Sequence, residues 1–251
     1  MTKLWWLLCA LLLPARGFAQ EADLVTDRPD FTESASVPGH GRVQVEGGWT
    51  VEEGGGHRAH SLGEVLVRIG VGERFEGRIE PGSWVSVDDA GEQTSGIDDA
   101  GLGFKVLLLE ATPPTIPAAA LLVSSSVPTG DDEIGESGWQ PETRLALGWD
   151  LSEVWSLGAN AGWGRPQDGG ERFDQALGSV ALGRSLNSRL GVFAEIYGFA
   201  PAAPGGDDAA HADGGFTFAI GPEVQLDVRA GVGLTDAAAD WLFGLGFARR
   251  W

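Results

Sequence analysis

The chain ends in the stretch Ala239-Asp240-Trp241-Leu242-Phe243-Gly244-Leu245-Gly246-Phe247-Ala248-Arg249-Arg250-Trp251. Large apolar side chains occupy every second position of this stretch: Trp241, Phe243, Leu245 and Phe247. Small residues such as Gly244 and Gly246 stand between them, and the terminal Trp251 lies in the same phase, which only Arg249 interrupts. A period of two predicts a β-strand with one apolar face.

The position of this strand at the C-terminus is informative as well. A strand whose apolar face ends in an aromatic residue resembles the closing strand of bacterial outer-membrane barrels, which is read by the barrel-insertion machinery. We therefore expect that machinery to be a partner of the strand that ends at Trp251. A soluble periplasmic all-β domain could show the same alternation, so other parts of the chain must separate the two classes.

The N-terminus has the features of a secretory signal peptide. Lys3 supplies a positive charge, Leu4–Leu13 form an apolar run, and Gly17-Phe18-Ala19 supplies a small-x-small cleavage signal. The run is shorter than the roughly 20 residues that a spanning helix needs, so a retained signal anchor is the less favoured alternative. We expect residues 1–19 to be removed together with Cys9, the only cysteine, after which the chain can form no disulfide.

Composition narrows the class further. The 251 residues carry 36 acidic and 17 basic side chains, and loss of Lys3 and Arg16 with the signal peptide would change the net charge from −19 to −21 (17 − 2 = 15 basic). Such a surface repels phosphates, so we expect no nucleic-acid partner. The 39 glycines and 10 tryptophans favour a barrel, in which tryptophan lies at the lipid interface. The mean hydropathy of −0.04 is the average that alternating lipid-facing and lumen-facing residues produce.

Further segments alternate in the same way, namely residues 43–51, 65–71, 75–79, 145–151, 155–163 and 226–234. Short connections, such as 72–74 and 152–153, take turns along the chain with long, acidic, glycine-rich ones at about 53–60, 88–98, 129–138, 165–172 and 201–213. Short turns at one rim and long loops at the other are typical of outer-membrane barrels. We therefore predict an all-β fold, an antiparallel up-and-down transmembrane barrel of about twelve strands over residues 41–251.

Residues 20–40 precede this barrel and show neither a strand nor a helix period. They contain Thr26-Asp27-Arg28-Pro29-Asp30-Phe31-Thr32-Glu33-Ser34 and Val37-Pro38, and Gln44-Val45-Glu46 and Gly48 follow. Val127-Pro128-Thr129-Gly130-Asp131-Asp132, Gln140-Pro141-Glu142 and Trp149-Asp150-Leu151-Ser152 stand further on. In these motifs, and over essentially the whole mature chain, the sequence resembles the family named "putative MetA-pathway of phenol degradation".

This resemblance implies an outer-membrane β-barrel of a family often regarded as transporters, with membrane lipid and lipopolysaccharide as surroundings. The substrates of the family are largely unassigned, and it supplies no agreed set of functional residues and no cofactor. Its name does not imply an enzyme activity on phenol.

The polar positions of the predicted strands would face the lumen and are the candidate functional residues. They are Arg42, Glu46, Glu64, Arg68, Glu76, Arg78, Glu80, Lys105, Glu142, Arg144, Asp227 and Arg229. Both signs often stand two positions apart, so they can pair across strands. Two interpretations stay open: a polar channel whose charges select solutes, or salt bridges that fill a narrow interior. Asp27, Arg28 and Asp30 join the candidates because residues 20–40 could enter the lumen as a plug, or remain a periplasmic tail.

Other possible sites are weaker. His57 and His60 have a metal-ligand spacing, but a glycine-rich loop does not force them together, so we predict no metal site there. The acidic loops could bind calcium or bridge lipopolysaccharide, although charged loops are usually just solvated. The four histidines do not form a recognisable constellation with a serine, and nothing positions the acid pair Asp27 and Asp30, so we expect no enzyme.

The sequence therefore predicts an outer-membrane barrel that passes small solutes, including hydrophobic or aromatic ones, by diffusion and without a cofactor. The first alternative is a non-conducting barrel that stabilises the membrane or scaffolds a partner. The second alternative is a barrel enzyme.

Overall fold

The computed structural model describes residues 24–251, so the predicted signal peptide (1–19) and residues 20–23 lie outside the described residues. The described chain contains sixteen β-strands: β1 (Val43–Gly54), β2 (His57–Gly70), β3 (Phe75–Glu80), β4 (Trp84–Asp89), β5 (Glu92–Ile97), β6 (Ala100–Leu109), β7 (Ala118–Val127), β8 (Gln140–Asp150), β9 (Trp155–Gly164), β10 (Gln167–Asp168), β11 (Glu171–Arg172), β12 (Gln175–Ser185), β13 (Leu190–Ala200), β14 (Ala209–Gly221), β15 (Val224–Gly233) and β16 (Trp241–Arg250). Within residues 24–251, no helix is long and apolar enough to cross a membrane.

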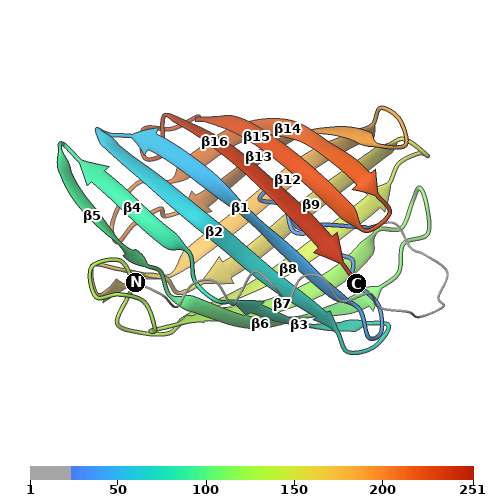
Figure 1. Ribbon diagram of the computed structural model, residues 1–251, viewed down its shortest axis with the longest axis horizontal. Helices are drawn as coiled ribbons and strands as arrows, with labels where there is room; N and C mark the ends of the chain where they lie inside the picture. Colours follow the sequence, from blue (N-terminus) through green and yellow to red (C-terminus); the bar gives the residue numbers. More distant parts are fainter. Residues whose placement is uncertain (1–23) are drawn as a thin grey trace, which may run out of the picture.

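Twelve strands close into an antiparallel barrel, as the alternation predicts (Figure 1). The order around the ring is β1, β16, β15, β14, β13, β12, β9, β8, β7, β6, β3 and β2, and β2 pairs with β1 to complete it. The seam between β1 and β16 runs from Gln44 opposite Arg250 to Glu53 opposite Trp241. The backbone of Trp251 extends this seam, because its N–H donates to the Val43 carbonyl at 2.8 Å.

The alternation also sets which face meets the lipid. On β16 the side chains of Trp241, Leu245 and Phe247 are exposed on the outer face, whereas Leu242 and Ala248 point inward and are buried. The fully buried side chains inside the barrel are mainly charged or polar, among them Gln44, Glu46, Arg68, Glu76 and Lys105. An apolar exterior around a charged interior is the reverse of a soluble protein and fits a chain that spans a membrane.

Two predicted long loops are instead β-hairpins. The residues expected as a loop at 53–60 continue β1 and β2 up to a turn at Gly55-Gly56, where both residues have positive φ. The residues expected as a loop at 88–98 form β4 and β5 around Ala90-Gly91, which also has positive φ at both positions. Such turns match the twist of paired strands, so polar residues can pair as strands beyond the lipid.

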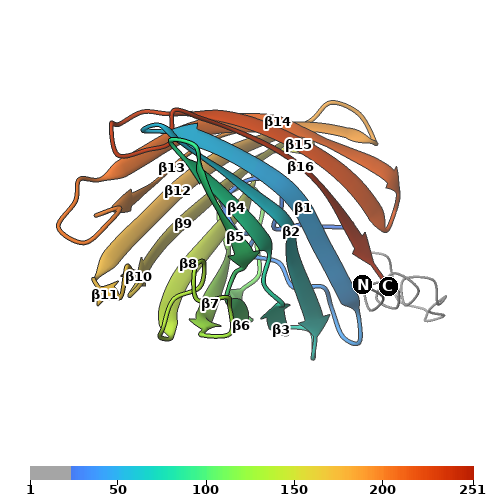
Figure 2. The same cartoon turned by 60° about the vertical axis from the view of Figure 1, so that its left-hand side comes forward.

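Strand β2 changes its neighbour halfway along its length. Its C-terminal half pairs with β3 and its N-terminal half with β4, and the change occurs at Gly63 and Glu64, which both have positive φ. The hairpin of β4 and β5 thus continues the β3–β6 pair beyond a bend (Figure 2). We call this end of the barrel, which carries the hairpins and long loops, the loop end. The end with the C-terminus and the short turns is the turn end.

The long connections at the loop end bind one another through carboxylates. Asp99 accepts hydrogen bonds from the backbone N–H groups of Thr129, Gly130 and Glu136 at 2.9–3.1 Å. Glu136 in turn accepts from Gly169 and Gly170, at the β10–β11 turn. The acidic residues of these loops therefore satisfy loop backbone donors.

Candidate functional site: the lumen and the N-terminal segment

Residues 24–42, which we call the N-terminal segment, run through the inside of the barrel, and Asp27 is the centre of their contacts. The Asp27 carboxylate lies 2.6 Å from Arg78 Nη1, 2.9 Å from Lys105 Nζ and 3.3 Å from Arg68 Nη1. These four side chains are at most 5% exposed. The segment is therefore a plug inside the barrel.

The register of the wall explains why an acid is needed at this place. Arg68 on β2 stands directly opposite Arg78 on β3, and like charges in that position repel each other. Asp27 lies between these two cations and Lys105 and offsets their repulsion. Burial alone would raise the pKa of Asp27, but Arg68, Lys105 and Arg78 outweigh burial and hold this pKa well below its usual value.

Two wall carboxylates complete this network. Glu76 pairs with Arg68 at 3.0 Å and with Arg78 at 2.9 Å, and Glu46 pairs with Arg68 at 3.1 Å. Glu46 also accepts the backbone N–H groups of Asp27 and Arg28 at 3.0 and 2.9 Å. Each buried charge thus has partners, which is the condition under which burial is tolerated.

The guanidinium of Arg28 lies in a narrow recess at the seam between β1 and β16. Gly48 and Gly246 are directly opposite each other there, and a Cβ atom at either position would overlap the guanidinium. Glu64 lies 2.9 Å from Arg28 Nη1, and Asp227 lies 3.6 Å from Nη2. We call this recess, formed by Gly48, Gly246, Glu64 and Asp227, the Arg28 slot.

The next residues of the segment contact the opposite wall. Glu195 on β13 accepts the backbone N–H groups of Phe31 and Thr32, both at 2.7 Å. The Phe31 ring stacks on Tyr197 with the ring centroids 4.7 Å apart. The Arg144 guanidinium lies 4.6 Å from the centroid of the Phe31 ring and donates a hydrogen bond to the Phe31 carbonyl. The segment is therefore held from both sides of the lumen.

Asp30 lies among other acids on this side. Burial, and then the negative charges of Glu195 and Asp213, raise the pKa of Asp30 well above its usual value. Glu195 and Asp213 stand directly opposite each other on β13 and β14 and are both buried. The segment thus meets a cationic wall at Asp27 and an acidic wall at Asp30.

Cavities lie on both sides of the segment, one towards each end of the barrel. One of about 360 Å³, the loop-end cavity, is lined by Arg28, Glu64 and Ser83. Another of about 380 Å³, towards the turn end, is lined by Asp30 and by apolar groups of Leu147, Trp149 and Phe193.

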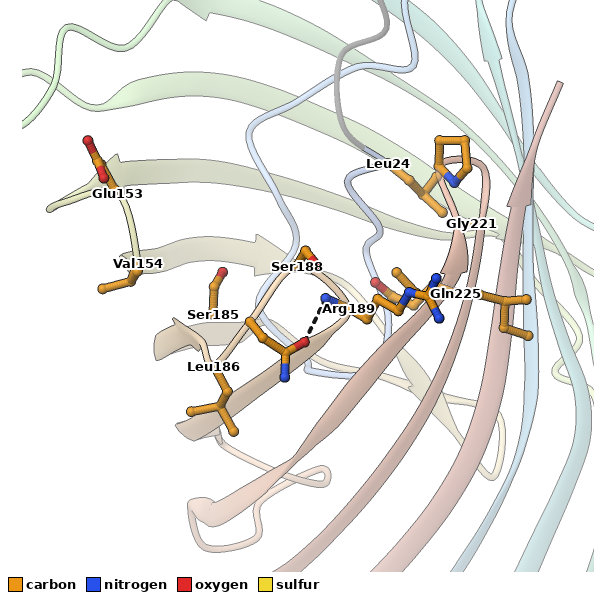
Figure 3. A pocket seen from close by; sticks show the side chains of 13 residues that line it. Leu24, Glu153, Val154, Ser185, Leu186, Ser188, Arg189, Gly221 and Gln225 are labelled. Atoms are coloured by element: carbon orange, nitrogen blue, oxygen red, sulfur yellow. Dashed lines mark hydrogen bonds between the residues drawn. The ribbon is translucent and has the colours of Figure 1, made fainter.

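A third cavity of about 620 Å³ lies at the turn end itself (Figure 3). Leu24 faces it from the N-terminal segment, and Arg189 and Gln225 face it from the wall. Because the segment lies between the loop-end cavity and the cavities towards the turn end, a solute that crosses the barrel must pass it.

Most of the candidates from the sequence meet in this network. Glu46, Arg68, Glu76, Arg78 and Lys105 surround Asp27, and Glu64 and Asp227 surround Arg28, as described above. The remaining candidates lie further out: Glu80 lines the loop-end cavity, Glu142 pairs with Arg144 at 2.9 Å, and Arg229 lies 3.9 Å from Asp213. Arg42 lies near the turn end, 3.4 Å from Glu223, and takes no part in the central network.

Several lumen residues on β9, β13 and β14 are not among the candidates predicted from the sequence. Asn160 accepts the Glu33 N–H at 2.8 Å, and Glu195 holds Phe31 and Thr32. A signal for Glu195 exists, because it is the one charged residue in Leu190–Ala200. Aromatic side chains on the inner face of β13, such as Tyr197, hide the alternation that would have revealed it.

The possible metal sites do not assemble. His60 stacks against Trp49 on the outer face, whereas His57 lies 3.2 Å from Asp89. Among residues 24–251, no group of three or more histidine, cysteine or acidic side chains is arranged to hold a metal ion.

Comparisons with known proteins agree with this architecture. The model of the family described as "Putative MetA-pathway of phenol degradation" matches residues 26–251. The crystal structure of the COG4313 outer membrane channel from Pseudomonas putida F1 superposes with a TM-score of 0.64 at 14% identity, covering 90% of this chain and 100% of that one. The translocator domain of the autotransporter NalP from Neisseria meningitidis reaches a TM-score of 0.49 at 15% identity, covering 84% and 88% of the two chains. No curated protein matches the sequence.

Proposed function

Because this chain belongs to the "Putative MetA-pathway of phenol degradation" family and is an outer-membrane β-barrel, we propose that it is a channel for passive passage of small solutes. The observation that carries the proposal is the continuation of the lumen into cavities on both sides of the N-terminal segment. Ion pairs and hydrogen bonds hold most of the segment between them, and Phe31 and Ala35 add apolar contacts with the wall. Movement of the segment would open a path from one cavity to the next.

Selection in such a path would depend on the lumen wall. Carboxylates and arginines line the part around Asp27 and Arg28, and apolar side chains such as Leu147 and Phe193 line part of the cavity towards the turn end. This mixture suits small solutes that have both a polar and an apolar part, which includes small phenolics. The proposal involves no cofactor and assigns no catalytic step to the barrel.

One observation favours a second function. The segment has polar contacts with the wall on both sides of the lumen, and the closed form of the barrel could itself be the working form. In that case the protein would be a non-conducting barrel that stabilises the membrane or scaffolds a partner.

Solute uptake into liposomes separates the two functions. Refolded protein is tested with a small sugar, an amino acid and a small phenolic, and protein-free liposomes are the control. Uptake above the control supports the channel, and the rank order of the three solutes gives its preference. If protein with a heat-shifted folded band on a gel passes none of the three, the channel proposal is wrong and the structural barrel is favoured.

A further inference from the structure

We propose that the Arg28 slot is a binding site for small solutes that carry a guanidinium group, and that Arg28 occupies it while no such solute is bound. The inference rests on the proposed channel function, since it names a class of solute for that channel. The slot accepts a planar cation, has more negative charge than Arg28 neutralises, and borders an acidic cavity.

The shape of the slot fits a flat group. Gly48 and Gly246 face each other across the β1–β16 seam, and Arg28 occupies the space that side chains would fill. Within residues 24–251, the Arg28 guanidinium donates hydrogen bonds to Glu64 at 2.9 Å and to the Leu245 carbonyl at 3.4 Å. A guanidinium is planar and presents several donors in one plane, so it can lie against exposed backbone in a way that a tetrahedral ammonium cannot.

Arg28 does not satisfy the hydrogen-bonding capacity of the Asp227 carboxylate in the slot. Asp227 is 6% exposed, and neither of its carboxylate oxygens accepts a hydrogen bond within the described chain. Its contact with Arg28 is a 3.6 Å ion pair, and Arg28 Nε has no hydrogen-bond partner there either. A buried carboxylate without a donor is costly, so a ligand that donates to Asp227 would be bound better than Arg28 is.

The slot can be reached from the loop end. The loop-end cavity of about 360 Å³ touches both Arg28 and Glu64. Its lining includes the carboxylates of Asp27, Glu33, Glu64, Glu80, Asp98 and Asp99. Arg78 and Lys105 pair with Asp27 and Glu33, so the negative charge that faces a solute is that of Glu64, Glu80, Asp98 and Asp99. Such a surface concentrates cations.

Competition with Arg28 keeps the affinity low. Arg28 is part of the chain and is held beside the slot by Asp27, so a free solute must compete with a high effective concentration of Arg28. Weak binding is what a channel needs, because a solute must also leave the site. A solute that takes the slot removes one attachment of the N-terminal segment and thereby favours the open path.

The test compares arginine with citrulline, which has the same shape but no charge, and with lysine, which has the charge but no planar group. Uptake of the three is measured in liposomes that contain the wild type, Asp227→Asn, or the control Asp208→Asn on the exposed β13–β14 loop. A second readout is the labelling rate of a cysteine placed at Ala35, which is 5% exposed while the segment is in place. It reports release of the segment without requiring conduction.

We expect arginine to enter severalfold faster than citrulline and lysine and to speed labelling, and we expect Asp227→Asn but not Asp208→Asn to abolish both effects. Equal rates for arginine and citrulline, equal rates for arginine and lysine, or a preference that survives Asp227→Asn would overturn the inference while the channel stands. If none of these three solutes enters, labelling alone decides about the slot, and the channel itself is judged by the sugar and phenolic uptake described above. Acceleration by arginine that is lost in Asp227→Asn then supports the slot, and no acceleration overturns it.

Discussion

At the scale of single residues, Asp27 and Arg28 have different roles in holding the N-terminal segment. Asp27 compensates a group of wall cations that would otherwise repel one another, so its removal affects the wall as well as the segment. Arg28 occupies a recess whose carboxylates it neutralises only in part. Two substitutions separate these roles.

We expect Asp27→Asn to release the segment. The change keeps the shape but removes one of the two carboxylates that Arg68, Arg78 and Lys105 share, the other being Glu76. Loss of one partner of a buried ion pair costs about 3–5 kcal/mol. Labelling of a cysteine at Ala35 should therefore accelerate by on the order of a hundredfold or more. Asp208→Asn is the matched control, and a labelling rate equal to that of the control would refute the assigned role of Asp27.

We expect Gly246→Ala to displace Arg28 without disturbing the barrel. The new methyl group would meet the guanidinium and the Asp227 carboxylate, and both are side chains that can move. Overpacking of this kind costs about 1–3 kcal/mol, so labelling at Ala35 should accelerate about tenfold while the heat-shifted gel band persists. Gly77→Ala is the control, because no atom lies within 4 Å of its added Cβ. Loss of the folded band would show that Gly246 supports the wall itself.

At the scale of elements, the alternation of apolar residues predicted the lipid-spanning parts of the strands. It did not predict that these strands extend beyond the lipid. The polar stretches around Gly55-Gly56 and Ala90-Gly91 have loop composition, yet they form hairpins. Positive φ at these turns allows tight pairing, whereas apolar alternation is required only where one face meets lipid. Composition therefore marks where the membrane ends and not where the strands end.

Asp99 is the carboxylate that accepts the most backbone hydrogen bonds from the β7–β8 loop. Asp99→Ala removes three backbone hydrogen bonds to the β7–β8 loop, and bonds to a charged acceptor contribute about 1.5–3 kcal/mol each. We expect a glutamate-specific protease to cut this loop, which contains Glu133 and Glu136, at least tenfold faster than in the wild type. Asp132→Ala in the same loop is the control. Equal cleavage of the two variants would mean that Asp99 does not order the loop.

At the scale of the whole molecule, the barrel and its N-terminal segment respond to pH together. Asp30 has a raised pKa while the segment is in place, so the segment binds a proton more readily when bound than when free. Its stabilising effect is complete below the free pKa of about 4 and is lost as the pH rises through the raised value. Asp27 has a lowered pKa, so its contribution is present above about pH 4 and lost in stronger acid.

We therefore expect the segment to be held most firmly in mild acid and to loosen as the pH increases. Labelling at Ala35 should accelerate with pH after each rate is divided by that of the same protein unfolded at the same pH. Asp30→Asn should weaken this pH dependence, and the part that remains belongs to Glu33, whose pKa burial raises to about 7. Asp208→Asn should behave as the wild type. A wild-type rate that does not change with pH would contradict the assigned effect of Glu195 and Asp213 on Asp30.

The sequence by itself determined the barrel, because lipid on one side of every strand imposes a period of two that Trp241, Phe243, Leu245 and Phe247 display directly. The sequence also predicted which charged residues face inward, because a charged side chain on a lipid-spanning strand is placed in the lumen and not in the lipid. It left open whether Asp27, Arg28 and Asp30 belong to a plug or a tail, and it missed Glu195. Only tertiary structure decided these points, because they depend on which strands become neighbours on closure. Gly48 comes to face Gly246 only when β1 pairs with β16 and closes the ring, and Glu195 reaches Phe31 and Thr32 only across the closed lumen.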